Sequence, residues 1–203
     1  MKFPVILFGM LFSMHTLADT SVPITVLNQK LSAVAYASEE QQTGCGLRAT
    51  GETKDALSLN VLVTVFRKDT GATFGVIKVV ARKVVMKDGA PVLQNGRPVI
   101  ANLGKIQRAW IKPDSGKQPA IDRNAESSHG DAYMVNAEFS GTVDLLVAMS
   151  KENFRVGLNR NDTGPDEIFQ FDQRLGQDEA GKFSICMGNL RVALQEEKSK
   201  EIF

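Results

Sequence analysis

Histidine and cysteine are scarce in this sequence of 203 residues, which contains two of each. Structural zinc sites need three or four histidine or cysteine ligands at set spacings, and no such cluster occurs here. The sequence also lacks a phosphate-binding glycine loop, a dinucleotide-binding fingerprint and the Gly-x-Ser-x-Gly elbow of many hydrolases. We therefore expect no metal, no cofactor and no catalytic residue of these classes.

Long apolar runs and long helical repeats are also missing. After the first 18 residues, no stretch is apolar over the roughly 20 residues that a membrane-spanning helix needs. No long stretch repeats its apolar residues every 3.6 positions, as an amphipathic helix would. Turn signals such as Asp88-Gly89 and Asn95-Gly96 recur instead. This rhythm predicts short strands joined by tight turns.

The first 18 residues have the features of a secretory signal peptide. Lys2 precedes an apolar run from Phe3 to Met14, and the small residues Thr16 and Ala18 stand just before Asp19. Signal peptidase cleaves after small residues at these two positions. We therefore predict a mature chain that is periplasmic or secreted, in a bacterial host.

The two cysteines, Cys45 and Cys186, predict one disulfide bond. An exported protein meets oxidising conditions, and the residues are too far apart in the sequence to form a Cys-x-x-Cys redox motif. Each cysteine is next to a glycine, which lets backbones approach closely. We expect the bond to join the first and last core strands, and the alternative is two unrelated buried thiols.

The clearest strand pattern lies in residues 57–86. Apolar residues alternate with mostly polar ones along residues 57–65, which predicts a strand with one dry side. A second run rich in valine and isoleucine returns along it, and Gly71 supplies the positive φ that a tight turn needs. The residues on the dry side are Leu57, Leu59, Val61, Val63 and Val65.

Similar patterns extend over most of the chain and predict an all-β fold. We expect an antiparallel β-sandwich over residues 45–194, or a barrel if the sheet edges close. Its expected parts include a hairpin over 133–139 and 142–149, an edge hairpin over 90–101, and strands at 183–187 and 190–194. A segment over 19–44, in which 31–38 suits a strand or a short helix, precedes the domain, and a charged tail over 195–203 follows it.

The tripeptide Asp-Thr-Gly occurs twice, at Asp69-Thr70-Gly71 and at Asp162-Thr163-Gly164. Aspartic proteases pair two aspartates in such tripeptides, so that two carboxylates share one proton. In those enzymes an apolar strand precedes each aspartate, whereas Arg67-Lys68 and Arg160-Asn161 precede the tripeptides here. We therefore interpret both as turns, in which aspartate bonds the backbone and glycine adopts positive φ.

A basic strand around the single tryptophan is the candidate binding site. Alternation places Arg108, Trp110 and Lys112 on one side of this strand and Lys105 on the other. An indole can stack on a sugar while the cations meet acidic groups. The alternative is that Trp110 belongs to the core and the basic side chains extend past it.

Charge is distributed unevenly along the chain. Residues 67–123 contain twelve Lys or Arg against four Asp or Glu, and residues 124–203 contain eight against fourteen. One interpretation is a basic face that binds an anionic partner or the acidic face of a second copy. The alternative is that strands from the two halves interleave, so that the asymmetry averages out.

The stretch from Pro113 to Asp131 predicts a long polar loop, and loops of this length are usually functional or disordered. Acid–base candidates in it are Asp122, Glu126, His129 and Asp131, although no calcium-loop pattern occurs. From all this we expect an exported, non-enzymatic binding or assembly module of the bacterial envelope. Its partner would be a protein, an anionic envelope or glycan component, or a second copy, and not nucleic acid. The alternative is a small secreted hydrolase that uses the 113–131 loop.

Overall fold

The computed structural model describes residues 22–38, 41–68, 70–115, 119, 121–161 and 164–200. The predicted signal peptide, residues 1–18, lies outside the described residues. Strands predominate over helices, and they pair in antiparallel fashion apart from one short parallel pair, which confirms the all-β prediction. In the part of the chain that is described, no helix has both the length and the apolar character needed to cross a membrane.

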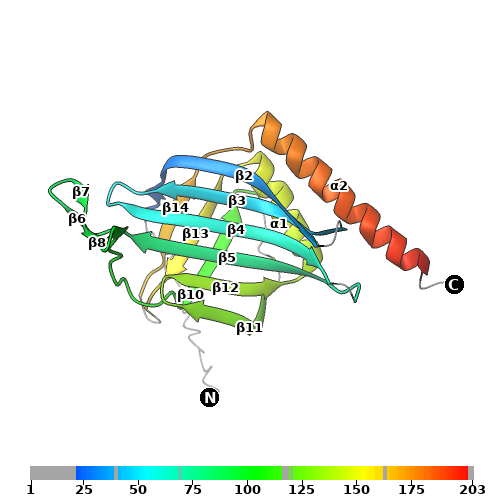
Figure 1. Ribbon diagram of the computed structural model, residues 1–203, viewed down its shortest axis with the longest axis horizontal. Coiled ribbons are helices and arrows are strands. Elements are labelled where there is room, and N and C mark those ends of the chain that lie inside the picture. Colours follow the sequence, from blue (N-terminus) through cyan, green and yellow to red (C-terminus); the bar gives the residue numbers. More distant parts are fainter. Residues whose placement is uncertain are drawn as a thin grey trace, which may run out of the picture.

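A six-stranded antiparallel sheet forms the centre of the molecule (Figure 1). Its strand order is β11-β12-β5-β4-β3-β2, and β2 to β5 follow one another as a meander. Within the described chain, the edge strands β11 and β2 do not pair with each other, so the sheet stays open. The strands are β2 (Leu27–Ser38), β3 (Gln41–Glu52), β4 (Leu57–Arg67), β5 (Thr73–Lys83), β11 (Ile121–His129) and β12 (Ala132–Ala137).

One side of this sheet, here called the inner face, forms the core. Strand β4 shows why, because its alternate residues Leu59, Val61, Val63 and Val65 are all at most 1% exposed. The hairpin turn that follows β4 is also as predicted. Gly71 has a φ of 78°, and its amide donates to the carbonyl oxygen of Lys68 at 2.9 Å. Asp69 itself lies outside the described residues.

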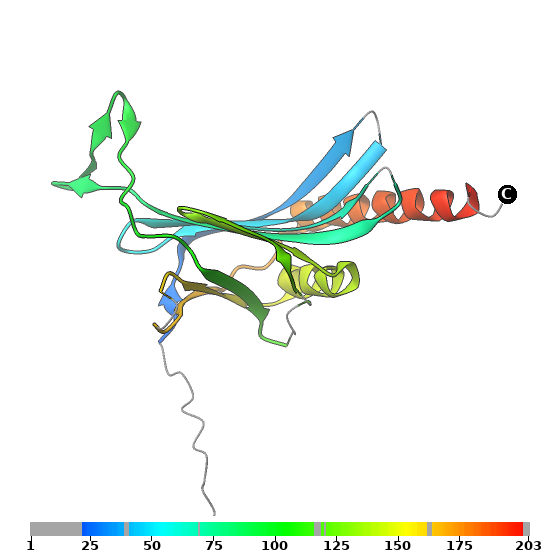
Figure 2. The ribbon, with the colours of Figure 1, turned by 90° about the horizontal axis from the view of Figure 1, so that it is seen from below.

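A four-stranded sheet and helix α1 (Phe139–Lys151) cover the inner face (Figure 2). Phenylalanines fill the small sheet, and the rings of Phe154 and Phe171 stack with their centroids 4.9 Å apart. Because a helix shares this layer, the predicted sandwich of two sheets is not confirmed. The strands, in sheet order, are β1 (Ile24–Thr25), β14 (Glu167–Phe171), β13 (Phe154–Asn159) and β10 (Arg108–Pro113).

Helix α1 corrects the predicted strand over residues 142–149. The prediction rested on apolar residues at every second position, but the buried residues of α1 recur every three or four positions: Thr142, Leu145, Leu146 and Met149. The helix begins where the side chain of Glu138 accepts hydrogen bonds from the backbone amides of Ser140 and Gly141. A carboxylate in this position satisfies amides that the helix itself leaves unpaired.

Helix α2 (Gln177–Lys200) corrects the predicted strands over 183–187 and 190–194, and it includes most of the predicted charged tail. Its buried residues Phe183, Cys186 and Leu190 again recur at helical spacing. Helix α2 packs on strands β2 and β3. Residues 27–38, which the sequence set apart from the domain, pair with β3 and form an edge strand of the large sheet.

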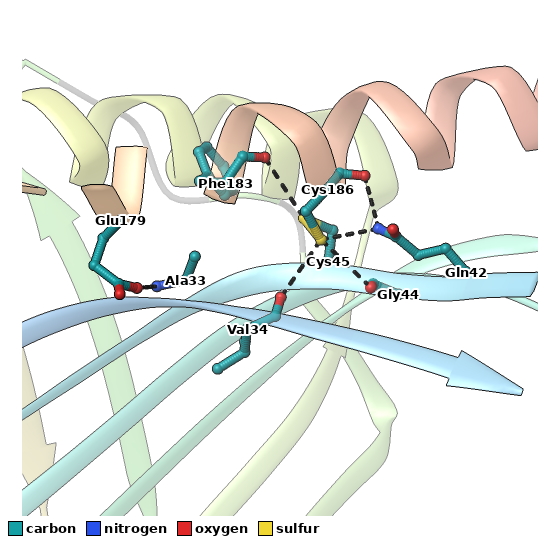
Figure 3. The surroundings of a disulfide bond; sticks show 8 residues. All are labelled: Ala33, Val34, Gln42, Gly44, Cys45, Glu179, Phe183 and Cys186. Carbon is teal, nitrogen blue, oxygen red and sulfur yellow. Dashed lines mark hydrogen bonds between the residues drawn. A yellow bond between two sulfur atoms is a disulfide. The ribbon is translucent and has the colours of Figure 1, made fainter. Parts of the chain in front are cut away.

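The disulfide bond between Cys45 and Cys186 is confirmed, but it joins strand β3 to helix α2 rather than two strands (Figure 3). Two hydrogen bonds hold the helix in the same place. Gln42 donates to the carbonyl oxygen of Cys186 at 2.7 Å, and Glu179 accepts from the backbone amide of Ala33 at 2.7 Å. The second bond satisfies an amide of edge strand β2, which would otherwise be free to pair with another chain.

The predicted long loop over 113–131 is largely wrong, because residues 121–129 form strand β11. This strand pairs with β12, and Gly130, with a φ of 55°, lies in the turn between them. Apolar alternation was not a usable signal here, because an edge strand can be held by backbone pairing to a single neighbour.

Residues 84–101 form a projecting segment, here called the arm, which rises from one end of the large sheet (Figure 2). The predicted hairpin at Asn95-Gly96 is present, and a second one precedes it at Asp88-Gly89. The four short strands of the arm are β6 (Met86–Lys87), β7 (Ala90–Pro91), β8 (Leu93–Gln94) and β9 (Arg97–Pro98).

Loss of the disulfide should lower stability. The bond closes a loop with a sequence separation of 141 residues, so it restricts the unfolded chain strongly. We expect the variant Cys45→Ala/Cys186→Ala to lose roughly 2–5 kcal/mol of unfolding free energy, measured by urea denaturation with circular dichroism. Wild-type protein unfolded in the presence of a reductant is the matched control and should behave similarly. An unchanged midpoint in both would contradict the prediction.

Candidate binding face

The side of the large sheet opposite the core, here called the open face, is the best candidate for a functional surface. Figure 2 shows neither helix nor second sheet over it, and it lies between the arm and the raised ends of β2 and β3. The strand register arranges its side chains in rows. Three neighbouring rows are Ser32, Arg48, Leu62, Lys78 and Met134 in the first, Val34, Gly46, Thr64, Val76 and Asn136 in the second, and Tyr36, Gly44, Phe66 and Phe74 in the third.

Three aromatic rings form the third row. The ring centroids of Tyr36 and Phe66 are 5.0 Å apart, and those of Phe66 and Phe74 are 5.6 Å apart. Gly44 makes this possible, because a Cβ at that position would lie 2.6 Å from a ring carbon of Phe66. The ammonium of Lys68 lies 5.2 Å from the centroid of Phe74, within the range of a cation–π contact. The row is therefore a half-buried aromatic cluster with a cation beside it.

Two cations flank an apolar side chain in the first row. Arg48 on β3 and Lys78 on β5 are exposed on either side of the half-buried Leu62 on β4. Within the described chain, neither Arg48 nor Lys78 forms an ion pair. The next cation on β5, Arg82, is by contrast paired with Asp131. The open face thus presents two uncompensated positive charges within an apolar surface.

Thr64 lies in the second row, between the cations and the aromatic cluster. Its side chain is 0% exposed although it is on the open face, and among the described residues its hydroxyl has no hydrogen-bond partner. The lack of a side chain at Gly46, on the neighbouring strand, leaves room for it, because a Cβ there would be 2.7 Å from the Thr64 hydroxyl oxygen. A buried hydroxyl without a partner costs about 1–3 kcal/mol, so this position is not optimised for stability.

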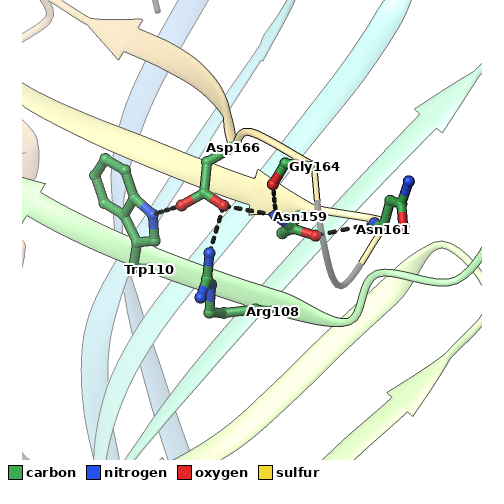
Figure 4. A network of polar contacts seen from close by, with 6 residues as sticks. All are labelled: Arg108, Trp110, Asn159, Asn161, Gly164 and Asp166. Atoms are coloured by element: carbon green, nitrogen blue, oxygen red, sulfur yellow. Dashed lines mark hydrogen bonds and ion pairs between the residues drawn. The ribbon is translucent and has the colours of Figure 1, made fainter. Parts of the chain in front are cut away.

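The predicted basic strand lies elsewhere, on the small sheet (Figure 4). As predicted, Arg108, Trp110 and Lys112 share one side of β10, whose alternate residues are buried. The carboxylate of Asp166 accepts hydrogen bonds from the indole of Trp110 at 2.6 Å and from Arg108 at 2.7 Å. The guanidinium of Arg108 and the indole N–H of Trp110 are therefore already hydrogen-bonded within the protein.

Asn159 completes this cluster, here called the Asp166 network. Its amide donates to Asp166 at 2.9 Å and to the carbonyl oxygen of Gly164 at 2.8 Å, so both residues are held at the end of β13. The indole of Trp110 lies over Gly157, where a Cβ would be 2.0 Å from the ring. These contacts give the network a clear structural role. Asp166 is 56 residues from Trp110 in the sequence, and no local pattern predicted that the two residues would meet.

Lys105 and Lys112 are exposed, and neither forms an ion pair in the described part of the chain. The binding role expected for Lys105, Arg108, Trp110 and Lys112 stays a prediction.

The described residues do not show the acid–base candidates of the 113–131 stretch forming a site. Asp122, Glu126 and His129 lie in β11, where only the backbone is described, and Asp131 is paired with Arg82. The second Asp-Thr-Gly tripeptide has only its glycine among the described residues. Across the side chains that are described, no group of three or more His, Cys, Asp or Glu could hold a metal ion.

Comparisons with protein-family models, with curated proteins and with solved structures found no match to this chain.

The Asp166 network should contribute stability that disappears in acid. Burial raises the pKa of Asp166, but hydrogen bonds from Trp110, Arg108 and Asn159 outweigh it, so the pKa lies below its ordinary value. A carboxyl with a lowered folded-state pKa stabilises the fold above its unfolded pKa of about 3.9, and loses this effect as the pH falls through the lowered value. Asp166→Asn should therefore cost about 1–3 kcal/mol at pH 7.

Urea unfolding of wild type and Asp166→Asn at pH 7 and at pH 3 measures this. The difference between the two proteins should shrink at the lower pH. Asp144→Asn, on the exposed side of α1, is the control and should leave the unfolding free energy unchanged at both pH values. A deficit of Asp166→Asn that is equally large at pH 3 would show that the charge of Asp166 is not the cause.

Replacing the unpaired hydroxyl of the open face should stabilise the protein. Thr64→Val keeps the shape of the side chain and removes the buried polar atom, so we expect a gain of about 1 kcal/mol in unfolding free energy. Thr50→Val, on the neighbouring strand, is the control and should have a smaller effect because Thr50 is half exposed. A loss of stability in Thr64→Val would mean that the hydroxyl has a stabilising partner in solution.

Proposed function

We propose that this protein is an exported, non-enzymatic binding module of the bacterial envelope, and that its open face holds an acidic partner protein. The observation that carries the proposal is the pair of unpaired cations, Arg48 and Lys78, on either side of Leu62 in an apolar face that no described element covers.

Two features support export. Residues 1–18 have the charge, apolar length and small residues of a signal peptide. The disulfide between Cys45 and Cys186 suits an oxidising compartment such as the periplasm or the extracellular space, because thiols stay reduced in the cytosol of most bacteria.

The charge of the open face supports an acidic partner. No carboxylate occurs among the described side chains of the three rows that contain Arg48, Lys78 and the aromatic cluster. Glu52, on the same face, lies four residues further along β3 than Arg48 and accepts a hydrogen bond from Asn28. An acidic partner would gain charge-assisted contacts and would be steered towards the face during encounter. Two copies meeting face to face would instead bring four of these cations into one interface.

The apolar rows support a protein rather than a small anion. Arginine and aromatic residues are enriched in protein interfaces, and the face offers Arg48 in its first row and the cluster of Tyr36, Phe66 and Phe74 in its third. Met134, at the end of the first row, is 40% exposed. The face lies between the arm at one end and the raised ends of β2 and β3 at the other (Figure 2). An amphipathic helix with an acidic flank would offer it a complementary apolar stripe and the opposite charge.

Two labelled helical peptides test the proposal by fluorescence anisotropy. Both carry the same leucine stripe, and one has glutamate while the other has lysine beside it. The glutamate peptide should bind the purified mature protein, and the lysine peptide should not. Arg48→Glu/Lys78→Glu should weaken binding of the glutamate peptide at least about tenfold, the loss of two charge-assisted contacts.

The matched control is Lys151→Glu/Arg191→Glu, which reverses two exposed cations on helices α1 and α2, on the other side of the large sheet, and should leave binding unchanged. Leu62→Asn should also weaken binding, because it removes the apolar centre of the first row. The proposal fails if the glutamate peptide does not bind, or if it binds Arg48→Glu/Lys78→Glu as tightly as wild type. It also fails if the control variant loses as much affinity.

A further inference from the structure

The arm is built from a seven-residue repeat. The segment Val85-Met86-Lys87-Asp88-Gly89-Ala90-Pro91 is followed by Val92-Leu93-Gln94-Asn95-Gly96-Arg97-Pro98, and then by Val99-Ile100. Each full repeat makes one hairpin. Both turns have positive φ at their two central residues, 50° and 79° in the first turn and 54° and 73° in the second, as tight two-residue hairpins need.

The three valines that begin the repeats hold the arm together. The amide of Val92 donates to Val85 at 2.8 Å, that of Val99 to Val92 at 2.8 Å, and that of Val85 to Val99 at 2.9 Å. These bonds form a closed ring of backbone contacts. A further bond from the amide of Ala101 to the carbonyl oxygen of Lys83, at 2.8 Å, ties the arm to the end of β5. The arm is thus a defined element, not an irregular loop.

Each valine is followed by an exposed apolar residue at the equivalent position of the repeat. Met86 is 47% exposed, Leu93 58% and Ile100 45%. A repeated arrangement of large apolar side chains in solvent is not explained by the folding of the arm alone. Such side chains are candidates for binding where they line a groove or a contiguous patch.

Met86 differs from its two equivalents because it lines a groove. The groove has a volume of 600 Å³ and lies between the base of the arm and the turn that joins β3 to β4. Val84, Val85 and Met86 line its arm side, and Lys54 and Asp55 line the other. A smaller cavity of 220 Å³ adjoins it. Leu57, Leu103 and Phe169 line this cavity together with Asp55 and with Arg160 and Glu167, which form an ion pair with each other.

Lys83 stands at the junction of these two spaces and lines both. Its side chain is half-buried, and in the described part of the chain its ammonium forms no ion pair. Lys54 adds a second ammonium in the groove, and Asp55 a single carboxylate. The groove therefore combines a net positive charge with apolar walls, and a cation that is partly removed from water favours an anionic partner.

We propose that this groove binds a single-chain anionic amphiphile. Its carboxylate or phosphate head lies against Lys83 and Lys54, and its apolar chain lies along Val84, Val85 and Met86. The adjoining cavity takes part of the chain between Leu57 and Phe169. The volume of the groove is within the range of about 300–1,000 Å³ that is usual for small-molecule sites. This site is separate from the open face and does not depend on the function proposed for it.

Isothermal titration calorimetry on the mature protein tests the proposal with three ligands that share a twelve-carbon chain. Laurate and dodecyl phosphate should each bind at one site, and dodecyltrimethylammonium should not, all below their micelle concentrations. A preference for laurate identifies free fatty acids as the source of the ligand. A preference for dodecyl phosphate identifies lipid phosphates. Either preference supports the proposal.

The repeat supplies a matched pair of variants. Met86→Gln should weaken binding at least about fivefold, the loss of part of an apolar wall, while Leu93→Gln at the equivalent position outside the groove should not. Lys83→Met should weaken binding of both anions at least about tenfold, and Lys87→Met on the arm should not. Asp55→Asn should tighten binding, because it removes the carboxylate that repels the head.

Circular dichroism spectra and thermal midpoints establish that each variant is folded. The proposal is overturned if neither anion binds, or if the trimethylammonium compound binds as tightly as they do. It is also overturned if folded Lys83→Met retains wild-type affinity, or if Met86→Gln and Leu93→Gln have the same effect.

Discussion

The burial of one face of the strands β3, β4 and β5 is the constraint on which the rest of this structure depends. Val61, Val63 and Val65 are fully shielded from solvent, so the elements that pack against the sheet have to lie on their side of it. The small sheet, helix α1 and helix α2 all lie there, and the disulfide fixes α2 to β3. Because the core needs only this face, the other face of the same strands is free to carry side chains that do not serve folding.

The open face shows the cost of that freedom. Half-exposed rings at Tyr36, Phe66 and Phe74 and a buried, unpaired hydroxyl at Thr64 each lower the stability or the solubility of a free monomer. Gly44 and Gly46 have no side chains, and a Cβ at either position would clash with Phe66 or Thr64 respectively. A surface that is unfavourable in isolation is more easily explained by a bound partner than by folding.

Local patterns predicted local structure well here, and contacts distant in the sequence were the limit. Strict alternation along β4 was sufficient to predict its buried side. The glycine at position 71 was sufficient to predict the turn, and the two cysteines were sufficient to predict the disulfide. Helix α1 was missed because its short apolar sequence satisfies period two as well as period 3.6 over eight residues. The partner of Trp110, Asp166, is 56 residues away, and nothing near either residue indicates the other. The rows of the open face required the register of five strands, which no single strand encodes.

The uneven charge of the sequence illustrates the same limit. The basic stretch over 67–123 suggested one basic face, but the fold distributes its cations over separate surfaces. Lys78 lies on the open face, Lys83 in the groove beside the arm, and Arg108 is bonded to Asp166 from the acidic half of the chain. Arg82 is likewise paired with Asp131. Ion pairs between the two halves neutralise some of these cations. The cations that form no ion pair among the described residues are the ones that can recognise a partner. In this protein the position of a cation after pairing is therefore more informative than the number of cations in the sequence.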